Sequence, residues 1–269
     1  MNSAEFARQA RIEVAKVLNK SNDSHIGGGY SSMDILAVLY TRILNVSNLN
    51  DPNRDVFILS KGHIAASFYT VLALAGILHM EDLSKHIVNG TNFAGHTRKY
   101  LTSGVAGVEM SAGSLGHGAN VGAGMAYAKR LQRLEGNVYV LMGDGECNEG
   151  SVWEAAALSS KLQLSNLVLI IDRNRLQAYG KDKEVLDMGD LAEKFRAFGC
   201  DSVAIDGHNH ELLFRELSLA TSKNPAKPKV IVAETIKGKG ASFMENRLEW
   251  HFKSPNDEQL QQIINEQSR

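Results

Sequence analysis

The feature that most constrains the fold is a series of short, almost wholly apolar runs separated by amphipathic stretches. The runs have the length and composition of buried strands, and they occupy residues 55–60, 138–142, 167–171, 202–205 and 230–233. Continuous apolar strands that alternate with helices indicate a parallel sheet covered by helices on both faces, an α/β fold. Ligands of such sheets bind beyond the carboxyl ends of the strands. We therefore expect the chemistry just after the first, second and third runs.

Segments of helical length fill the spaces between these runs. Ser31 or Ser32, which follow a glycine triplet at 27–29, are expected to cap the second helix, because a hydroxyl can accept from first-turn amides. One domain over residues 1–269 is the economical interpretation, since no linker or repeat divides the chain. The predicted helices cover 3–20, 31–44, 63–75, 81–88, 151–162, 189–198 and 210–222, with another that ends at 129–133 and one docking helix in the tail 254–269.

Composition argues against several classes of protein. The formal net charge is −1, so no global basic field points to nucleic acid. Cys147 and Cys200 are too few for a disulfide scaffold or a thiolate zinc site, and they suit a reducing compartment. No apolar run approaches the ~20 residues of a membrane span, and the charged N-terminus is unlike a signal peptide. We expect a cytoplasmic protein with neither nucleic acid nor membrane as a partner.

Hard oxygen donors follow two neighbouring apolar runs. Asp144 stands between two glycines after the second run, and Asn174 follows the third. Mg²⁺ prefers octahedral oxygen ligands shared between one or two side chains and substrate phosphates, and glycines let a ligand approach the backbone. A lone Gly-Asp-Gly is more often a tight turn. Its pairing with an asparagine thirty residues later favours a metal and phosphate site.

This pair resembles the diphosphate-binding motif of thiamine-diphosphate enzymes, which opens with Gly-Asp-Gly and closes with Asn. The resemblance implies the diphosphate-binding (PP) fold. It also implies that the side chains of Asp144 and Asn174 and the main-chain carbonyl of Leu176 hold Mg²⁺, for which Ca²⁺ or Mn²⁺ could substitute. Gly145, with Asp144 and Asn174, would contact the thiamine diphosphate.

Further motifs resemble transketolases specifically, and they occur in transketolase order. They are SHIGG at 24–28, LSKGH at 59–63, GH at 95–96, SAGSLGHG at 111–118, GSVWEAA at 150–156, and KGKG at 237–240 with WH at 250–251. Three residues depart from the family pattern. Ile26 and Thr97 stand where proline is common, and His117 stands where glutamine is frequent. These departures hint at an unusual substrate.

The resemblance also implies roles for the histidines. Transketolases move a two-carbon ketol unit from a ketose to an aldose, and the cofactor acts as the electron sink. His25, His96 and His251 would line the sugar channel and move protons on donor hydroxyls, because imidazole titrates near neutral pH. His251 would also contact the cofactor.

The resemblance implies that a different histidine binds the diphosphate. His63 would contact the diphosphate, assisted by backbone groups of Gly113, Ser114 and Leu115. Two interpretations of His117 stay open: it could make a functional contact, or it could only form part of a polar wall of the site. The histidines without a motif are interpreted as structural: His79, His86, His208 and His210.

The chain stops at Arg269, where full-length transketolases continue into a pyrimidine-binding domain. In that family, a glutamate of this second domain contacts the aminopyrimidine of the cofactor. The resemblance therefore implies a split enzyme, an α2β2 heterotetramer. Its partner subunit would carry the pyrimidine and C-terminal domains, the glutamate and the phosphate-binding arginines. Glu149 matches a family acid that bridges towards that glutamate, and the alternative is an exposed carboxylate at a helix start.

Other interpretations compete with this one. The α subunit of a 2-oxo-acid dehydrogenase also carries Gly-Asp-Gly and Asn, but it should lack His25 and the histidine motifs at 61–63 and 250–251. A 1-deoxyxylulose-5-phosphate synthase is disfavoured by the chain length and the loop at 113–116. A non-catalytic cofactor-binding subunit is disfavoured by the intact metal and diphosphate residues. The sugar stays open among pentose phosphates, apulose phosphate and a sulfonated hexose.

Overall fold

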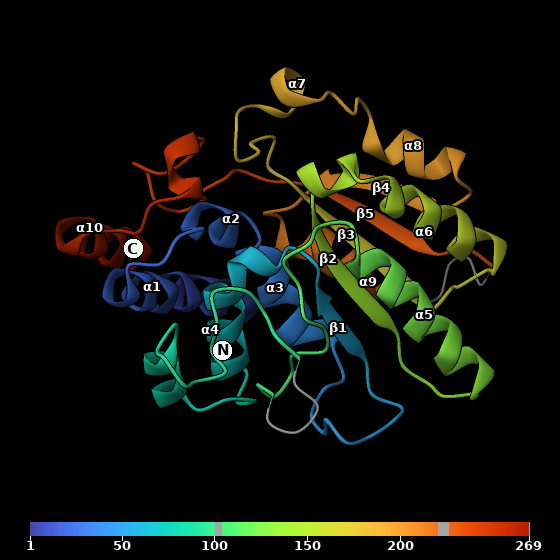
Figure 1. The fold of residues 1–269 in the computed structure, drawn as a ribbon, viewed down its shortest axis with the longest axis horizontal. Helices are drawn as coiled ribbons and strands as arrows, with labels where there is room; N and C mark the ends of the chain where they lie inside the picture. The colour runs from blue at the N-terminus through green and yellow to red at the C-terminus, as the bar shows by residue number, and fades with distance from the viewer. Residues whose placement is uncertain (100–103, 220–225, 269) are drawn as a thin grey trace.

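A five-stranded parallel sheet, with the order β1-β2-β3-β5-β4, organises the chain (Figure 1). The structure is a computed structural model, and it describes residues 1–99, 104–219 and 226–268. Each of the five apolar runs forms a strand, so the predicted parallel α/β sheet is confirmed. The strands are β1 (Val56–Leu59), β2 (Val138–Gly143), β3 (Leu167–Arg173), β4 (Asp201–Asp206) and β5 (Lys229–Glu234).

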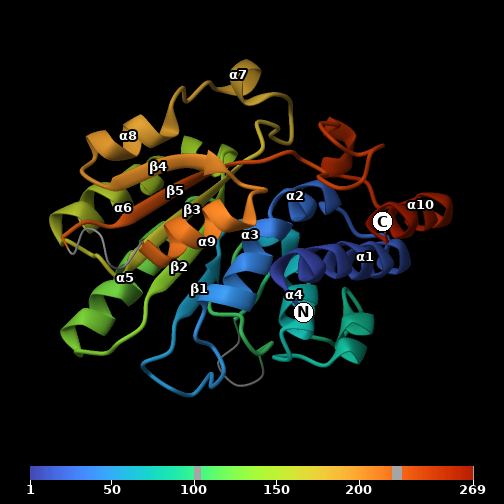
Figure 2. The same ribbon diagram turned by 180° about the vertical axis from the view of Figure 1, so that it is seen from behind.

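Helices connect the strands and cover both faces of the sheet, as Figures 1 and 2 show from opposite sides. The α-helices are α1 (Ser3–Ser21), α2 (Ile26–Ser31), α3 (Met33–Val38), α4 (Ala65–Leu74), α5 (Gly118–Leu131), α6 (Gly150–Lys161), α7 (Asp182–Val185), α8 (Leu191–Ala197), α9 (His210–Leu219) and α10 (Asp257–Gln267). Shorter helical turns are a π-helix at Leu39–Ile43 and 3₁₀ helices at Gly62–Ile64, Met80–Lys85, Gly145–Asn148 and Leu248–His251. The predicted end of the helix 210–222 lies outside the described residues.

Side chains that alternate along each strand enter two separate hydrophobic cores. On β2, Tyr139 and Leu141 belong to the core that α1, α3, α4 and α9 complete. Val138 and Val140 belong to the core that α5, α6 and α8 complete on the other face. Because both faces of the central strands are buried, β2, β3 and β5 are apolar at most positions, which explains why the sequence shows continuous runs there. The edge strand β4 is only partly buried.

The two ends of the described chain pack together. α1 begins with a capping box, in which the side chain of Asn2 accepts from the amide of Glu5 and the side chain of Glu5 accepts from the amide of Asn2. α10 begins with the same motif. α10 packs against α1 and buries Ile263. The predicted docking helix in the tail is therefore confirmed. In the described part of the chain, no helix is long and apolar enough to cross a membrane.

Three local predictions are wrong. Residues 81–88 form a 3₁₀ helix at Met80–Lys85 instead of an α-helix. The helix predicted from residue 31 to 44 is divided into α2, α3 and the π-helix. Ser32 starts α3 but does not cap it, because its hydroxyl donates to the carbonyl of Gly28 at 3.1 Å and to Asp172 at 2.8 Å.

The glycine triplet lies inside α2 and not in a loop before it. A Cβ on Gly29 would lie 2.0 Å from the hydroxyl oxygen of Ser67 on α4. Glycine weakens a helix in isolation, but here its lack of a side chain lets α2 and α4 approach closely. This packing brings His25 and Gly28, at the start of α2, to the edge of the sheet.

Two glycines of α5 provide a matched test of the core packing. A Cβ on Gly122 would lie 2.5 Å from Cγ2 of Val140, whereas a Cβ on Gly124 would meet nothing within 4 Å. Gly122→Ala should therefore lower the free energy of unfolding by about 1–3 kcal/mol through overpacking. Gly124→Ala should raise it by up to about 1 kcal/mol through helix propensity. Urea unfolding would measure both, and equal effects of the two substitutions would contradict the packing.

Candidate active site

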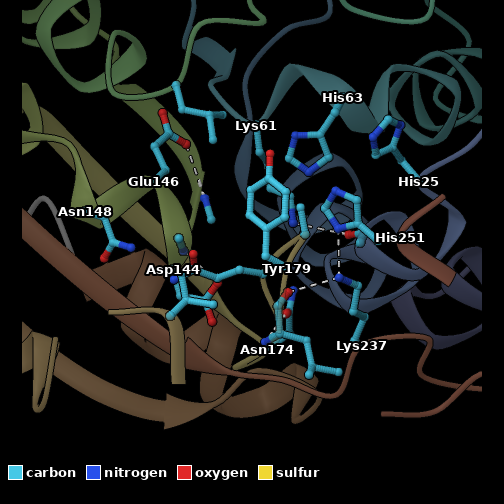
Figure 3. A pocket seen from close by; sticks show the side chains of 18 of the residues that line it. His25, Lys61, His63, Asp144, Glu146, Asn148, Asn174, Tyr179, Lys237 and His251 are labelled. Carbon is cyan, nitrogen blue, oxygen red and sulfur yellow. Dashed lines mark hydrogen bonds between the residues drawn. The ribbon is translucent and has the colours of Figure 1, made fainter. Parts of the chain in front are cut away.

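The carboxyl ends of β1, β2, β3 and β5 meet at one edge of the sheet, where they border a pocket of about 410 Å³ (Figure 3). This volume is typical of a small-molecule site. Gly143 at the end of β2 pairs in register with Asp172 on β3, so the residues after these two strands lie side by side. The pocket is thus where the strand pattern predicts chemistry.

Asp144, Asn174 and Leu176 all line this pocket. The carboxylate of Asp144 accepts hydrogen bonds from the amides of Arg175 at 2.6 Å and Gly145 at 2.8 Å. Burial, together with the negative charge of Asp172, raises the pKa of Asp144 to about 6. No ion pair found among the described residues includes Asp144. The carboxylate therefore forms no direct ion pair there, and the charge of Lys61 lowers its pKa by less than burial and Asp172 raise it.

This donor set fits a divalent cation. It combines a buried carboxylate, a side-chain amide and a main-chain carbonyl, all of which offer hard oxygens. The amide nitrogen of Asn174 lies 3.3 Å from both the carboxylate of Asp172 and the hydroxyl of Ser31. Because the nitrogen has these acceptors, the amide orientation is fixed, and the oxygen accepts from the amide of Leu176 at 3.1 Å. Mg²⁺ held here would neutralise the charge of Asp144.

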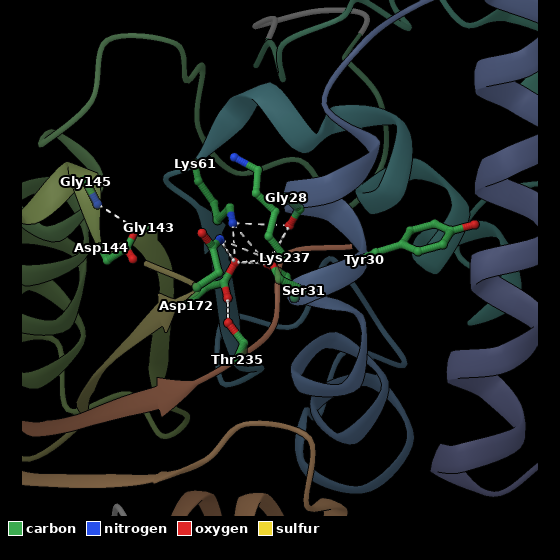
Figure 4. Close-up of polar contacts among 12 residues, drawn as sticks. Gly28, Tyr30, Ser31, Lys61, Gly143, Asp144, Gly145, Asp172, Thr235 and Lys237 are labelled. Carbon is green, nitrogen blue, oxygen red and sulfur yellow. Dashed lines mark hydrogen bonds and ion pairs between the residues drawn. The ribbon is translucent and has the colours of Figure 1, made fainter. Parts of the chain in front are cut away.

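A buried polar network lies beneath the metal donors (Figure 4). Asp172 is fully buried, and its carboxylate accepts from the ammonium group of Lys61 and from the hydroxyls of Ser31, Ser32 and Thr235. Burial acts to raise the pKa of Asp172, but the charge of Lys61 and these hydrogen bonds outweigh burial and lower it. A buried ion pair is tolerated when its remaining hydrogen-bonding positions are satisfied. The network therefore holds Asp172 as a carboxylate.

Three histidines, His25, His63 and His251, line the other side of the pocket, and His96 lies next to His25. The ring centroid of His25 lies 5.1 Å from that of His63, 5.1 Å from that of His251 and 6.0 Å from that of His96. His25 has a left-handed backbone (φ 72°) at the start of α2, and its amide donates to the carbonyl of His251 at 3.1 Å. A left-handed non-glycine residue is strained, and such residues often occur at functional sites.

The rings of His25, His63 and His251 are neutral at pH 7, because their pKa values are lowered. Burial and the charge of His96 lower the pKa of His25 to about 4, and burial and the charge of Lys237 lower that of His251 to about 3. Burial and Lys61 hold the pKa of His63 well below its usual value. A bound anion would raise all three pKa values, since an opposite charge favours the protonated ring.

Lys237, which follows β5, connects the two sides of the pocket. Its ammonium group lies 3.0 Å from the carbonyl of Leu176 and 2.9 Å from Nδ1 of His251. Burial, with the like charge of Lys61, lowers the pKa of Lys237 to about 8, so the group is largely protonated at neutral pH. A donating ammonium leaves Nδ1 of His251 as an acceptor and places the ring proton on Nε2.

Most predicted site residues border the pocket. They are His25, His63, Gly113, Leu115, Asp144, Gly145, Glu149, Asn174, Leu176 and His251. His96 and Ser114 are not among the lining residues, and both are exposed. His117 is also exposed, and Nδ1 of its ring contacts the carbonyl of Leu115 at 3.1 Å.

Sequence reasoning missed three charged residues of this pocket: Lys61, Glu146 and Lys237. Lys61 and Lys237 follow β1 and β5 directly, so their positions after apolar runs could have indicated them. The histidines interpreted as structural behave differently from those of the pocket. His208 and His210 contact the carboxylate of Asp34 at 2.7 and 3.1 Å, away from the site.

Solved structures define the class of this domain. The chain superimposes along its whole length on transketolase from Leishmania mexicana, with a TM-score of 0.90 and 28% identity, and it covers 42% of that chain. Transketolase from Campylobacter jejuni gives the same TM-score at 29% identity, with 43% of that chain covered. The fold is thus the α/β thiamine-diphosphate-binding fold, as predicted.

The sequence comparisons give the family. Residues 3–266 match the family described as "Transketolase, thiamine diphosphate binding domain". An apulose-4-phosphate transketolase subunit of Phocaeicola vulgatus is 36% identical over 96% of this chain and 91% of its own length. The 6-deoxy-6-sulfo-D-fructose transketolase subunit SqwG of a Clostridium species is 37% identical over 87% of this chain and 84% of its own length. The chain belongs to the transketolase family.

Human transketolase is 34% identical over 97% of this chain, but the chain spans only 41% of its length. The relatives that match along most of their own length are named as separate subunits. The prediction of an N-terminal, thiamine-diphosphate-binding transketolase subunit is therefore confirmed.

Asp144→Asn should change the pH dependence of stability in the metal-free protein and weaken metal binding. Because folding raises the pKa of Asp144 to about 6, the ionised carboxylate destabilises the folded state above that pH. The penalty becomes smaller as the pH falls from 6 towards the unfolded value near 4. The NH₂ group of the asparagine would face one of the amides that donate to Asp144, but this cost does not depend on pH. With EDTA, the unfolding free energy of the variant relative to the wild type should therefore be about 2 kcal/mol higher at pH 8 than at pH 4.5.

Denaturant unfolding from pH 4.5 to 8 would measure this difference. Asp187→Asn is the matched control, because Asp187 is exposed. A difference between the variant and the wild type that does not change with pH would contradict the raised pKa of this buried carboxylate.

Proposed function

We propose that this chain is the diphosphate-binding subunit of a two-subunit transketolase that requires thiamine diphosphate and Mg²⁺. The observation that carries the proposal is one pocket with oxygen donors on one side and a cluster of histidines on the other. The first group suits a metal–diphosphate unit, and the second suits a polyhydroxylated substrate. The family match supports the cofactor, and the donor set supports the metal.

In this proposal, the strand ends hold the cofactor. Asp144, Asn174 and the carbonyl of Leu176 bind Mg²⁺, which shares its remaining positions with the diphosphate. His63 and Lys237 supply the nearest positive charge or hydrogen-bond donors for phosphate oxygens. Backbone groups of Gly145 and of the loop that carries Gly113, Ser114 and Leu115 complete the anion site. The bound cofactor supplies the electron sink for carbon–carbon bond cleavage.

His25, His96 and His251 face the substrate in the proposed function. A neutral imidazole can accept a hydrogen bond from a sugar hydroxyl or donate one to a carbonyl oxygen. The negative charge of the diphosphate would raise the lowered pKa values of His25 and His251 towards the range that proton transfer at neutral pH requires. The proton on Nε2 of His251, placed there by Lys237, makes this ring a donor in its resting form.

A second, separate polypeptide completes the enzyme in this proposal. Two relatives that match along most of their length are named as one subunit of a transketolase. The pocket includes Glu149 at the start of α6, where an acid could meet a partner's glutamate. We infer that residues 1–269 form one PP domain. The pyrimidine and C-terminal domains then belong to the partner, in an α2β2 assembly. Both cysteines are free and buried, which supports a reducing compartment such as the cytoplasm.

The donor sugar is proposed to be a ketose with an anionic terminal group. Two relatives with nearly equal identity are named for apulose 4-phosphate and for 6-deoxy-6-sulfo-D-fructose, and both names carry such a group. Two lysines of this chain line the pocket. Lys61 donates to the carboxylate of Asp172, and Lys237 donates to the carbonyl of Leu176 on the cofactor side. Recognition of the terminal anion is therefore assigned to the partner.

Titration calorimetry would test the metal-dependent cofactor site. Thiamine diphosphate should bind in the presence of Mg²⁺, Ca²⁺ or Mn²⁺ and lose at least about tenfold in affinity with EDTA. Asn174→Ala should cause a similar loss, since one metal ligand is removed. Asn265→Ala on the exposed face of α10 should bind like the wild type. Binding that is the same with EDTA, with the partner present, would favour a non-catalytic subunit.

Ketol transfer should require the partner. The purified chain alone should show no transfer, and the reconstituted complex should restore it. Glu149→Gln should lower the rate of the complex by about tenfold or more if this acid takes part in the proton path. Exposed Glu193 on α8 offers the control, Glu193→Gln. Full activity of the chain alone would contradict the split enzyme.

A further inference from the structure

Glu146 joins three segments at the edge of the sheet through one buried carboxylate. It lies in the 3₁₀ helix after β2 and is 1% exposed. One carboxylate oxygen accepts from the hydroxyl of Ser60, which follows β1, and from the amide of Gly116 at 2.9 Å. The other oxygen accepts from the amide of Gly143, at the end of β2, at 3.3 Å. The segment that contains Gly116 is the loop 113–118, which leads into α5.

Further hydrogen bonds hold the loop 113–118 around Gly116 and Gly118. The carbonyl of Gly116 accepts from the hydroxyl of Ser151 at 2.8 Å and from the side chain of Asn120 at 3.0 Å, so both sides of its backbone are held. Gly116 has a left-handed backbone (φ 84°), and a Cβ would lie 2.6 Å from Cβ of Glu149. The amide of Gly118 donates to the hydroxyl of Ser60 at 3.1 Å. The pocket residues of the loop precede these anchors.

An ionised carboxylate accepts from all three donors, although burial raises the pKa of Glu146. A glutamine in its place would turn an NH₂ group towards one of these donors. Because both oxygens have donors, Glu146 is not a free base for catalysis. A buried negative charge beside a site for an anionic ligand opposes binding of that ligand. The unfavourable effect of the Glu146 charge must therefore be offset by a stabilising contact, and the hydrogen bond to the loop 113–118 is such a contact.

We propose that Glu146 is a positioning residue that holds the loop 113–118 against the ends of β1 and β2, in the form that receives the cofactor diphosphate. The proposal rests on the proposed cofactor site and extends it. Glu146 then contributes to the affinity for thiamine diphosphate indirectly, because it positions the loop 113–118.

The test compares Glu146→Gln with Glu193→Gln, whose side chain is exposed on α8. Hydrogen exchange of peptides that cover residues 111–120, measured without ligand, should be about tenfold faster in the first variant and unchanged in the second. The dissociation constant for thiamine diphosphate with Mg²⁺ should rise about tenfold or more, which is the usual effect of losing a buried, charge-assisted hydrogen bond.

Each contrary result overturns a defined part of the proposal. Unchanged exchange and unchanged affinity would show that Glu146 does not hold the loop. Weaker binding with unchanged exchange would show direct contact with the cofactor and no positioning role. If Glu146→Gln does not fold, Ser60→Ala decides, since it removes one donor to the carboxylate and the acceptor of Gly118. Unchanged exchange in Ser60→Ala would then overturn the proposal. Failure of the wild type to bind cofactor would defeat the proposed function, whereas exchange without ligand would still test the loop.

Discussion

The carboxylate of Asp172 is the contact on which the arrangement of the site depends. It ends β3, it is fully buried, and it receives hydrogen bonds from residues that follow β1 and β5 and from the junction of α2 and α3. Burial of an isolated carboxylate and an ammonium group costs several kcal/mol for each ion. The pair formed with Lys61 is stable because each oxygen of Asp172 has donors. These contacts fix the strand ends relative to one another.

This network also sets the electrostatics of the pocket. Asp172 orients the amide of Asn174 and raises the pKa of Asp144, so the side that faces the proposed metal is acidic. Burial, with the charges of Lys61 and Lys237, lowers the pKa values of His63 and His251, so the opposite side is basic but carries neutral rings. A metal–diphosphate unit matches both sides, with its cation against the acids and its anion against the lysines and histidines. Ligand binding would therefore relieve the unfavourable charges of the free protein.

Much of the fold could be predicted from the sequence because buried parallel strands are apolar at every position. The strand ends then placed Asp144 and Asn174 together, and the register of β2 and β3 agrees. The histidines came from the resemblance, since isolated histidines carry little information. The network around Asp172 could not be predicted, because its partners Thr235, Lys61 and Ser31 are 63 to 141 positions away from Asp172 along the chain. Two of the three donors to Glu146, Ser60 and Gly116, are 86 and 30 positions away from it and could not be predicted for the same reason. The helix α2 was not predicted because three successive glycines disfavour a helix in isolation, and the close packing of Gly29 against Ser67 cannot be read from the sequence.

The most direct test of this account is a crystal structure of the chain with thiamine diphosphate and Mn²⁺, with anomalous data recorded at the manganese edge. The account predicts one strong peak at roughly 2.0–2.3 Å from oxygens of Asp144 and Asn174 and from the carbonyl of Leu176, with a diphosphate oxygen completing the coordination. A manganese peak bound by other residues, or a diphosphate held without a metal at these three groups, would contradict it.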